Sequence, residues 1–386
     1  MKILKSRLVC TLLSVLVTAT VASAQSQQDL KKFDRLFSIK LREGDVPGGA
    51  YVIVKEGEIL QLGTLGYRKA TEHSKVNKDT AFRLASVSKT FAATLAAKLV
   101  EEGTLSFEEK VAPYAPELRL RSSASLKALN IRHLLSHTSG LMPNAYDNIL
   151  EAGRPVEEIL PRFNKVRALC QPGDCYGYQN IMFSLVEPVI KEKTGADYGD
   201  LIEERLFKPL EMNTASVGFA PFLDAKNVAA PHQRTRKGVK PVQVKEDYYR
   251  IAPAAGVNAS IVDLSKWLIA HTGHRPDVIS PEVLKTLTAK QIESKRQMGK
   301  KLWRPHLTDA HYGLGWRLYQ FHDEEIVAHG GAVAGFRSMV AYSADRDVGL
   351  AILINTNSNI IDELTISFFD DVFTSPLPRT VVAASR

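Results

Sequence analysis

The placement of strand-like and helix-like sequence along the chain limits its architecture more than any other feature. Runs rich in β-branched and aromatic residues lie near both ends, at residues 51–62 and 325–354. The middle has helical lengths or spacings instead, as at residues 86–102 and 181–193. Because strands must share a sheet to bury their apolar faces, we expect an antiparallel sheet built from both termini and flanked by helices. The helical part is then an insertion into this α/β (α+β) fold.

This pattern also predicts the domain organisation. The expected units are an α/β sheet domain and a mainly helical domain, formed by residues 25–85 with 255–375 and by residues 86–254 respectively. Ser260 to Asp263 is a capping-box sequence that opens a further helix through Leu268, where the chain returns to the sheet. Residues 280–309 are charged and show no clear period, and residues 376–386 predict a flexible tail.

The first residues resemble a secretory signal. Three cations precede an apolar run from Leu8 to Val21, and Ala22-Ser23-Ala24 is a small-residue cleavage sequence. The run is too short for a comfortable membrane span, so we expect no stable membrane anchor once the signal is removed. The sequence therefore predicts a signal peptide at residues 1–24 and a periplasmic or secreted protein.

Charge and cysteine content agree with such a protein. The formal net charge is +8, and three of the positive charges lie in the predicted signal. The remaining basic residues do not cluster with aromatic residues, so we expect no nucleic-acid partner. Cys10 would leave with the signal. Cys170 and Cys175 then remain around a turn sequence, and an oxidising compartment favours a disulfide between them. Two buried free thiols are the alternative.

Ser86 and Lys89 are a candidate nucleophile and base. Apolar residues recur every fourth position from Val87 to Leu99, which predicts a buried helix with Ser86 on its first turn and Lys89 on the same side. A serine hydroxyl needs a neighbouring base, and a lysine is one only if burial lowers its pKa. A helix N-terminus also favours a developing negative charge. The alternative is a capping serine beside a surface lysine.

Two further elements are candidates for the same site. In Tyr178-Gln179-Asn180, the tyrosine can carry a proton between nucleophile and leaving group, while the asparagine can hold the lysine and an acyl amide. His329-Gly330-Gly331-Ala332 follows a predicted strand, where glycines let the backbone approach a ligand and the Ala332 N–H can stabilise an oxyanion. Each element alone also fits a structural role, as a core tyrosine with a helix cap or as a glycine turn.

In this order, the three elements resemble those of the serine β-lactamase and penicillin-binding protein superfamily. The chain is most similar to class C β-lactamases and their DD-peptidase, D-aminopeptidase and esterase relatives. Flanking sequences agree, at residues 82–85, 131–141, 312–316 and 353–356. The resemblance implies that Ser86 is acylated, that Lys89 and Tyr178 manage the proton, and that Asn180 positions the substrate. It also implies an oxyanion hole formed by the N–H groups of Ser86 and Ala332.

The third element departs from the usual Lys-Thr-Gly. His329 and Gly330 replace the lysine and the threonine, although Gly331 is kept, and a neutral imidazole binds a substrate carboxylate less well than a permanent cation. Arg337 is a candidate to replace the missing charge, or else a solvated strand residue. His133 and His137 are four residues apart, a spacing that can bind zinc on a helix. They belong, however, to a segment that is common in this family.

We therefore expect an exported serine hydrolase that acts through a Ser86 acyl-enzyme on β-lactam or D-amino-acid amide bonds. The alternatives are a carboxylesterase of the same fold with weak β-lactam turnover and a non-catalytic penicillin-recognising protein. The expected partner is a small-molecule or peptide substrate: a β-lactam, a D-amino-acid peptide or an ester. We expect no cofactor and no metal.

Overall fold

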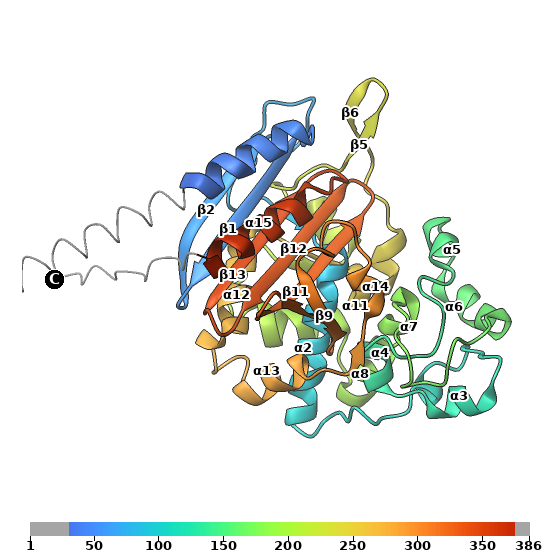
Figure 1. The fold of residues 1–386 in the computed structure, drawn as a ribbon. Helices are drawn as coiled ribbons and strands as arrows, with labels where there is room; N and C mark the ends of the chain where they lie inside the picture. The colour runs from blue at the N-terminus through green and yellow to red at the C-terminus, as the bar shows by residue number, and fades with distance from the viewer. Residues whose placement is uncertain (1–30, 375–386) are drawn as a thin grey trace, which may run out of the picture.

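Eight antiparallel strands form the main sheet of residues 31–374, the part of the chain that this computed structural model describes (Figure 1). Their order is β2-β1-β13-β12-β11-β10-β9-β8. The strands are β1 (Gly48–Lys55), β2 (Glu58–Gly66), β8 (Ile292–Glu293), β9 (Leu307–Tyr312), β10 (Arg317–Phe321), β11 (Glu324–Val333), β12 (Phe336–Ser343) and β13 (Val348–Ile354). The N-terminal hairpin pairs with the C-terminal strand, with Gly49 opposite Ile354. The expected antiparallel sheet from both ends of the chain is confirmed.

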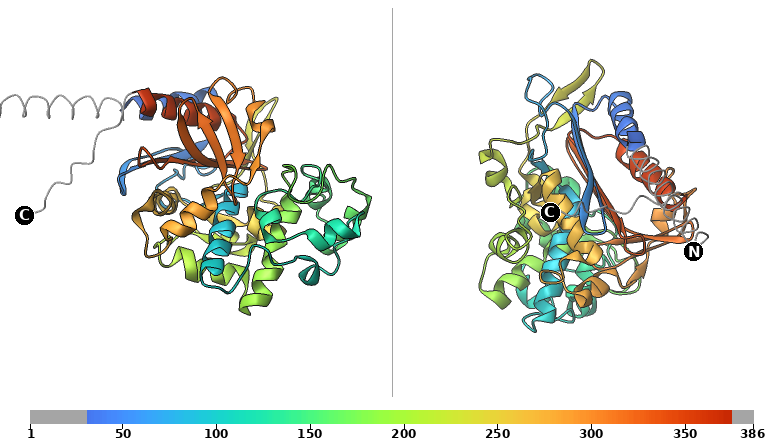
Figure 2. Two further views of the ribbon diagram at one scale, coloured as in Figure 1. Left: turned by 60° about the horizontal axis from the view of Figure 1, so that its bottom comes forward. Right: turned by 90° about the vertical axis from the view of Figure 1, so that its left-hand side faces the viewer.

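Helices cover both faces of this sheet (Figure 2). Residues 31–43 and α15 (Ile360–Thr374) pack on one face, and α12 (Ile261–Ile269) and α2 (Ser88–Glu101) lie on the other. The central strand β13 is apolar and buried along its whole length because both of its faces are covered. The edge strand β2 is only partly buried.

Between the first and last parts of the sheet the chain is mainly helical. The helices include α3 (Ser123–Ala128), α4 (Ile131–Leu135), α5 (Asp147–Glu151), α6 (Val156–Ile159), α7 (Asn180–Ser184), α8 (Val186–Thr194), α9 (Tyr198–Ile202), α10 (Phe219–Asp224), α11 (Ala252–Ala255), α13 (Pro281–Thr288) and α14 (Lys295–Met298). The helical character expected over residues 181–193 is present, but the helix is divided at Leu185 into α7 and α8. Pro188 explains the break: its ring would clash with the carbonyl of Ser184, four residues earlier.

Short strands also interrupt the range that was expected to be mainly helical. They are β4 (Ser216–Val217), β5 (His232–Thr235) and β6 (Gly238–Pro241). Strand β4 joins β3 (Phe82–Arg83) and β7 (Val257–Ala259) in a small sheet of order β3-β7-β4, which ties the entry and the exit of this region together. The capping box predicted for α12 is present, since Ser260 and Asp263 exchange side-chain to backbone hydrogen bonds.

Two expected features lie outside the described residues: the signal peptide at residues 1–24 and the tail at residues 376–386. Within residues 31–374, no helix combines the length and the apolar character needed to cross a membrane.

Candidate active site

Ser86 stands in a 3₁₀ turn, η1 (Ala85–Val87), that runs directly into α2. The sequence predicted that the α-helix begins at Ser86, whereas in the structure Ser86 lies in the 3₁₀ turn and the α-helix begins at Ser88. Ala85 has a φ of +49°, a left-handed conformation that costs a residue with a Cβ about 1 kcal/mol. Val87 and Phe91 are both fully buried and anchor the following helix in the core. The serine hydroxyl therefore stands on a rigid support.

Lys89 is fully buried beside Ser86, one turn along α2. Its Nζ lies 3.2 Å from Ser86 Oγ, 2.7 Å from Asn180 Oδ1 and 3.0 Å from the carbonyl oxygen of Ala254. The Tyr178 ring lies beside it, with its centroid 4.8 Å from Nζ. The structure thus brings together the nucleophile, base, tyrosine and asparagine that the sequence singled out.

Burial lowers the pKa of Lys89 well below its usual value, since water cannot stabilise the ammonium form there. A neutral amine has two N–H donors and one lone pair. Asn180 Oδ1 and the Ala254 carbonyl oxygen can only accept, so they take the two N–H groups and the lone pair faces Ser86 Oγ. In this state Lys89 is arranged to accept the serine proton.

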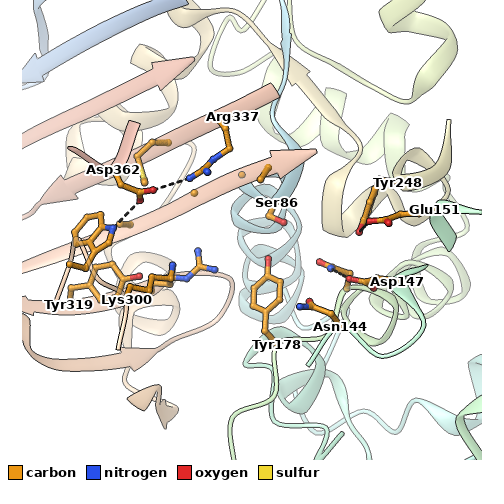
Figure 3. Close-up of a pocket in the computed structure, with 18 of the residues that line it drawn as sticks. Ser86, Asn144, Asp147, Glu151, Tyr178, Tyr248, Lys300, Tyr319, Arg337 and Asp362 are labelled. Carbon is orange, nitrogen blue, oxygen red and sulfur yellow. Dashed lines mark hydrogen bonds and ion pairs between the residues drawn. The ribbon is translucent and has the colours of Figure 1, made fainter. Parts of the chain in front are cut away.

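Tyr178 directs its hydroxyl toward Ser86 from the segment that precedes α7 (Figure 3). The main chain around it is fixed, because the Asn144 N–H donates to the Tyr178 carbonyl at 2.8 Å and the Gln179 N–H donates to His137 Nδ1 at 3.2 Å. Burial raises the pKa of Tyr178, so its phenol is neutral. A neutral phenol directed at the nucleophile can release a proton and recover one.

Asn180 links Lys89 to Asp147, a carboxylate that sequence reasoning missed. The Asn180 Nδ2 donates to Asp147 Oδ2 at 2.7 Å. Asp147 is 8% exposed, and its Oδ1 has no hydrogen-bond partner among the described residues. Burial raises its pKa, while the Asn180 hydrogen bond and the charge of Lys89 oppose that shift. No motif pointed to Asp147, because it lies 33 residues before Asn180 and only the fold joins them.

Strand β11 passes close to the nucleophile at Gly331. A Cβ at Gly331 would lie 2.1 Å from the Leu84 carbonyl oxygen and 3.1 Å from Ser86 N, so only glycine fits. Strand β10 pairs with β11 only as far as Ala328, and beyond it the edge of β11 is not paired by β10. Ala332 lines the cleft beside Ser86. The two residues expected to provide oxyanion donors therefore come from elements that approach one another closely.

His329, expected to bind substrate, does not line the cleft and is fully buried. Its Nδ1 lies 3.0 Å from the Gly330 carbonyl oxygen, which can only accept, so Nδ1 carries the proton and Nε2 accepts from the Tyr312 hydroxyl at 3.0 Å. Burial lowers its pKa well below the usual value. The expected substrate-binding role of His329 is corrected, because its ring is buried and Ala328, Gly330, Gly331 and Ala332 of β11 line the cleft instead.

A cleft of about 510 Å³ opens around Ser86 and Tyr178, with polar side chains on opposite sides of them (Figure 3). The acidic wall comes from the helical region and consists of Asn144, Asp147, Asn148, Glu151 and Tyr248. The basic wall comes from the sheet side and consists of Lys300, Trp303, Arg317, Tyr319, Arg337 and Asp362. Neither wall was predicted as a whole from the sequence.

The cations of the basic wall differ in their pairing. Arg337, the candidate replacement charge, is neutralised by Asp362, with NH2 3.0 Å from Oδ2. Within residues 31–374, Lys300 and Arg317 have no ion-pair partner, and the buried Nε of Arg317 has no hydrogen bond. Lys300 stays accessible at the mouth of the cleft, but the surrounding protein lowers its pKa to about 8 and the Arg317 charge adds to this shift. The basic wall therefore presents unpaired positive charge.

Cys170 and Cys175 form a disulfide, with their Cα atoms 6.1 Å apart. The loop it closes packs on the segment that follows α4, where the Gly173 N–H donates to the Thr138 carbonyl at 2.8 Å. Gly140 has a φ of +78°, and a Cβ there would lie 2.4 Å from the Cys170 carbonyl oxygen. The bridge thus closes a loop that ends three residues before Tyr178.

Histidines do not form a metal site at the cleft. His133 lies in α4, but that helix ends at residue 135 and His137 follows it with a left-handed φ of +58°, so the two do not share a helix face. In the described part of the chain, one group has donor atoms within 4.8 Å of one another, namely His306, His322 and Asp370. None of these three lines the cleft.

Comparison with known proteins gives consistent matches along the chain. A family model, Beta-lactamase, matches residues 33–365. Protein flp of Staphylococcus aureus (strain MW2) is 23% identical over 342 residues, which are 88% of this chain and 65% of that protein. Penicillin-binding protein 4 of Amycolatopsis lactamdurans is 26% identical over 351 residues, 89% of this chain and 87% of that protein. This chain thus spans less than two thirds of the length of Protein flp.

A solved structure shares the fold. The octameric penicillin-binding protein homologue from Pyrococcus abyssi has a TM-score of 0.80 at 24% identity, and the match covers 90% of this chain and 78% of that one. At this level of identity the likeness concerns the fold alone. It agrees with a terminal antiparallel sheet joined to a helical region.

Proposed function

Because this chain belongs to the beta-lactamase family, whose model matches residues 33–365, we propose that it is a serine hydrolase acting through an acyl-enzyme on Ser86. One observation carries the proposal: the buried amine of Lys89 contacts Ser86 Oγ while Asn180 and a backbone carbonyl hold it in place. A surface lysine beside a capping serine would be solvated and would keep its usual pKa. Here burial lowers the pKa of Lys89 and favours its neutral form.

In acylation, Ser86 Oγ attacks the substrate carbonyl carbon and its proton passes to the Lys89 amine. The carbonyl oxygen takes the negative charge, and the N–H groups of Ser86 and Ala332 are the donors that stabilise it. Tyr178 then gives its proton to the leaving nitrogen or oxygen as the bond to carbon breaks. Lys89 returns the serine proton to Tyr178, so both groups regain their starting state.

In deacylation, a water molecule takes the place of the leaving group. The Tyr178 hydroxyl relays one proton of this water to the Lys89 amine as the water oxygen attacks the acyl carbon, and the bond to Ser86 Oγ then breaks. Ser86 recovers a proton from the same pair, and the carboxylic acid product leaves. The chemistry needs only groups that the cleft already holds.

We propose a class C β-lactamase-like preference for β-lactam or D-amino-acid amide bonds with an anionic leaving group. The support is the unpaired charge of Lys300 and Arg317 on the basic wall, where Arg317 Cζ lies 5.4 Å from the Tyr178 ring centroid. Tyr178 protonates the leaving group, so a carboxylate on that group would lie near these cations. The signal-like N-terminal sequence and the disulfide support action outside the cytoplasm.

A carboxylesterase with weak β-lactam turnover is the second candidate. It is favoured by one observation, that the buried neutral His329 stands where the usual Lys-Thr-Gly element has a lysine. A non-catalytic recognition protein is less well supported, because none of the motif residues for acylation is missing.

Turnover of a chromogenic cephalosporin and of a short-chain nitrophenyl ester, measured side by side, tests these candidates. We expect wild-type protein to hydrolyse at least one of them and Ser86→Ala to lose that activity. A higher kcat/KM for the cephalosporin supports the leading proposal, and a higher value for the ester supports the second. Equal hydrolysis by wild type and Ser86→Ala would contradict both.

A further inference from the structure

The acidic wall contains a carboxylate oxygen that the protein leaves unused. Asp147 is more than nine-tenths buried and lines the cleft, yet only its Oδ2 is bonded, to Asn180. Its Oδ1 has no hydrogen-bond partner in residues 31–374. A buried carboxylate oxygen without a donor is unfavourable by about 1–3 kcal/mol or more. Such an oxygen in a cleft points to a donor that arrives with a ligand.

A second carboxylate lies close by, and one donor serves both. The Tyr248 hydroxyl donates to Glu151 Oε1 at 2.8 Å and also lies near enough to Asp147 to lower its pKa, but it has a single proton for the two carboxylates. The negative charge of Glu151 in turn raises the pKa of Asp147, although burial is the larger cause. Neither carboxylate has an ion-pair partner within the described part of the chain. This pair therefore lacks the positive charge that would complete it.

We propose that the acidic wall binds a protonated amine at the end of the acyl part of the substrate, with Asp147 as its main ligand and Glu151 at the rim. This inference rests on the proposed function. The leaving group lies beside Tyr178, which protonates it, and so near Arg317. The acyl part must extend the other way, along Asn180 to the carboxylate bonded to it. The substrate class is a short peptide with a free N-terminus.

The two walls lie on opposite sides of Ser86 and Tyr178 (Figure 3), so in this proposal they select opposite ends of one zwitterionic substrate. A primary ammonium has three donors, enough to reach both Asp147 and Glu151. An acylated amine has one donor and no charge, so it cannot replace the ammonium. The competing explanation is that Asp147 only holds Asn180 in place, in which case charged and acetylated ligands should respond alike to its substitution.

A pair of boronic acids separates these explanations without depending on turnover. Glycylamidomethylboronic acid and its N-acetyl derivative both bond reversibly to a serine Oγ, both contain an amide for Asn180, and only the first has a terminal ammonium. Calorimetric dissociation constants are measured for wild type, Asp147→Asn, Glu151→Gln and the control Lys300→Gln on the basic wall. The quantity compared is the ratio of the two constants within each protein.

We expect wild type to bind the free amine more tightly by about tenfold or more, as for hydrogen bonds to charged groups. Asp147→Asn should abolish this preference, Glu151→Gln should reduce it, and Lys300→Gln should leave the ratio intact. Equal binding of both compounds by wild type would overturn the inference, as would an unchanged ratio in Asp147→Asn. If neither compound bonds to Ser86, the proposed function itself is contradicted and the inference falls with it.

Discussion

At the catalytic centre the Lys89 amine has three hydrogen-bond partners within 3.2 Å, whereas on the walls Asp147 Oδ1 and Arg317 Nε have none among residues 31–374. Both regions are buried polar surroundings in one cleft. They differ in whether the protein itself supplies the hydrogen-bond and ion-pair partners. The centre is satisfied by the protein alone, whereas Lys300 and Arg317 on one wall and Asp147 and Glu151 on the other have no ion-pair partner among residues 31–374.

We infer from this difference that the catalytic centre carries out the reaction and that the walls determine which substrates bind. An unsatisfied buried donor or acceptor is unfavourable by about 1–3 kcal/mol, so a complete network at the centre keeps the base and nucleophile in one geometry before substrate arrives. Unpaired groups on the walls remain available for the substrate, and they favour ligands that carry matching charges. Changes at the centre should therefore remove activity on all substrates, and changes on the walls should alter preference.

The largest expected effect comes from Lys89→Met, which keeps most of the length of the side chain and removes the base. We expect acylation by a reactive β-lactam or ester to slow by about a thousandfold or more, because residues that act as one unit lose nearly everything singly. Stopped-flow acylation rates measure this. The control, Lys300→Met, removes a lysine from the same cleft and should retain most of the rate. A near-normal rate in Lys89→Met would show that another base serves.

Gly331→Ala should have the next largest effect. Its Cβ would lie 2.1 Å from the Leu84 carbonyl oxygen and would push β11 away from the nucleophile, so we expect kcat to fall about a hundredfold, as for loss of an oxyanion donor. Gly330→Ala is the matched control, because its Cβ would meet nothing closer than Met339 at 3.3 Å. Similar kcat values in the two variants would argue against a close role for β11.

Arg317→Gln tests the basic wall. We expect kcat/KM to fall about tenfold for a substrate with a carboxylate on the leaving group, since a hydrogen bond to a charged group is lost. A matched substrate with a neutral amide in that place should be affected much less. Equal losses on both substrates would indicate that Arg317 supports the fold or Tyr178 and does not select charge.

Lys300 should give a smaller, pH-dependent effect. Its pKa of about 8 means that the positive charge is present below this pH and is lost as the pH rises through it. We therefore expect kcat/KM for the anionic leaving group to fall by a few-fold above about pH 8. Lys300→Gln should lack this alkaline step, and its kcat/KM should be lower at neutral pH. An unchanged step in the variant would assign it to another group.

The same division explains how much the sequence could predict. The nucleophile, base, tyrosine and asparagine lie in short motifs, so residue type and local spacing sufficed to find them. The walls are assembled from short elements without periodicity, including the unassigned stretch at residues 280–309 that contains Lys300 and Trp303. Asp147 had no local signal, because its partner lies 33 residues away.

Other errors have specific physical causes. The orientation of His329 depends on which face of β11 meets the cleft, and a glycine-rich strand gives little alternation from which to predict that face. The interruption at Leu185 within the expected helical stretch has a sequence signal in Pro188, because a proline ring clashes with the carbonyl four residues before it in a continuous helix. The sheet was predictable because its apolar β-branched runs lie near the two ends of the chain, separated in sequence from the helical middle.

The central claim is that Ser86 becomes covalently acylated, and intact mass tests it most directly. Wild-type protein and Ser86→Ala are incubated with a β-lactam or an acyl phosphonate, and the mass of each chain is recorded. We expect one adduct per wild-type chain, located at Ser86 by peptide mapping, and none on the variant. No adduct on wild type with either reagent, or an equal adduct on Ser86→Ala, would contradict it.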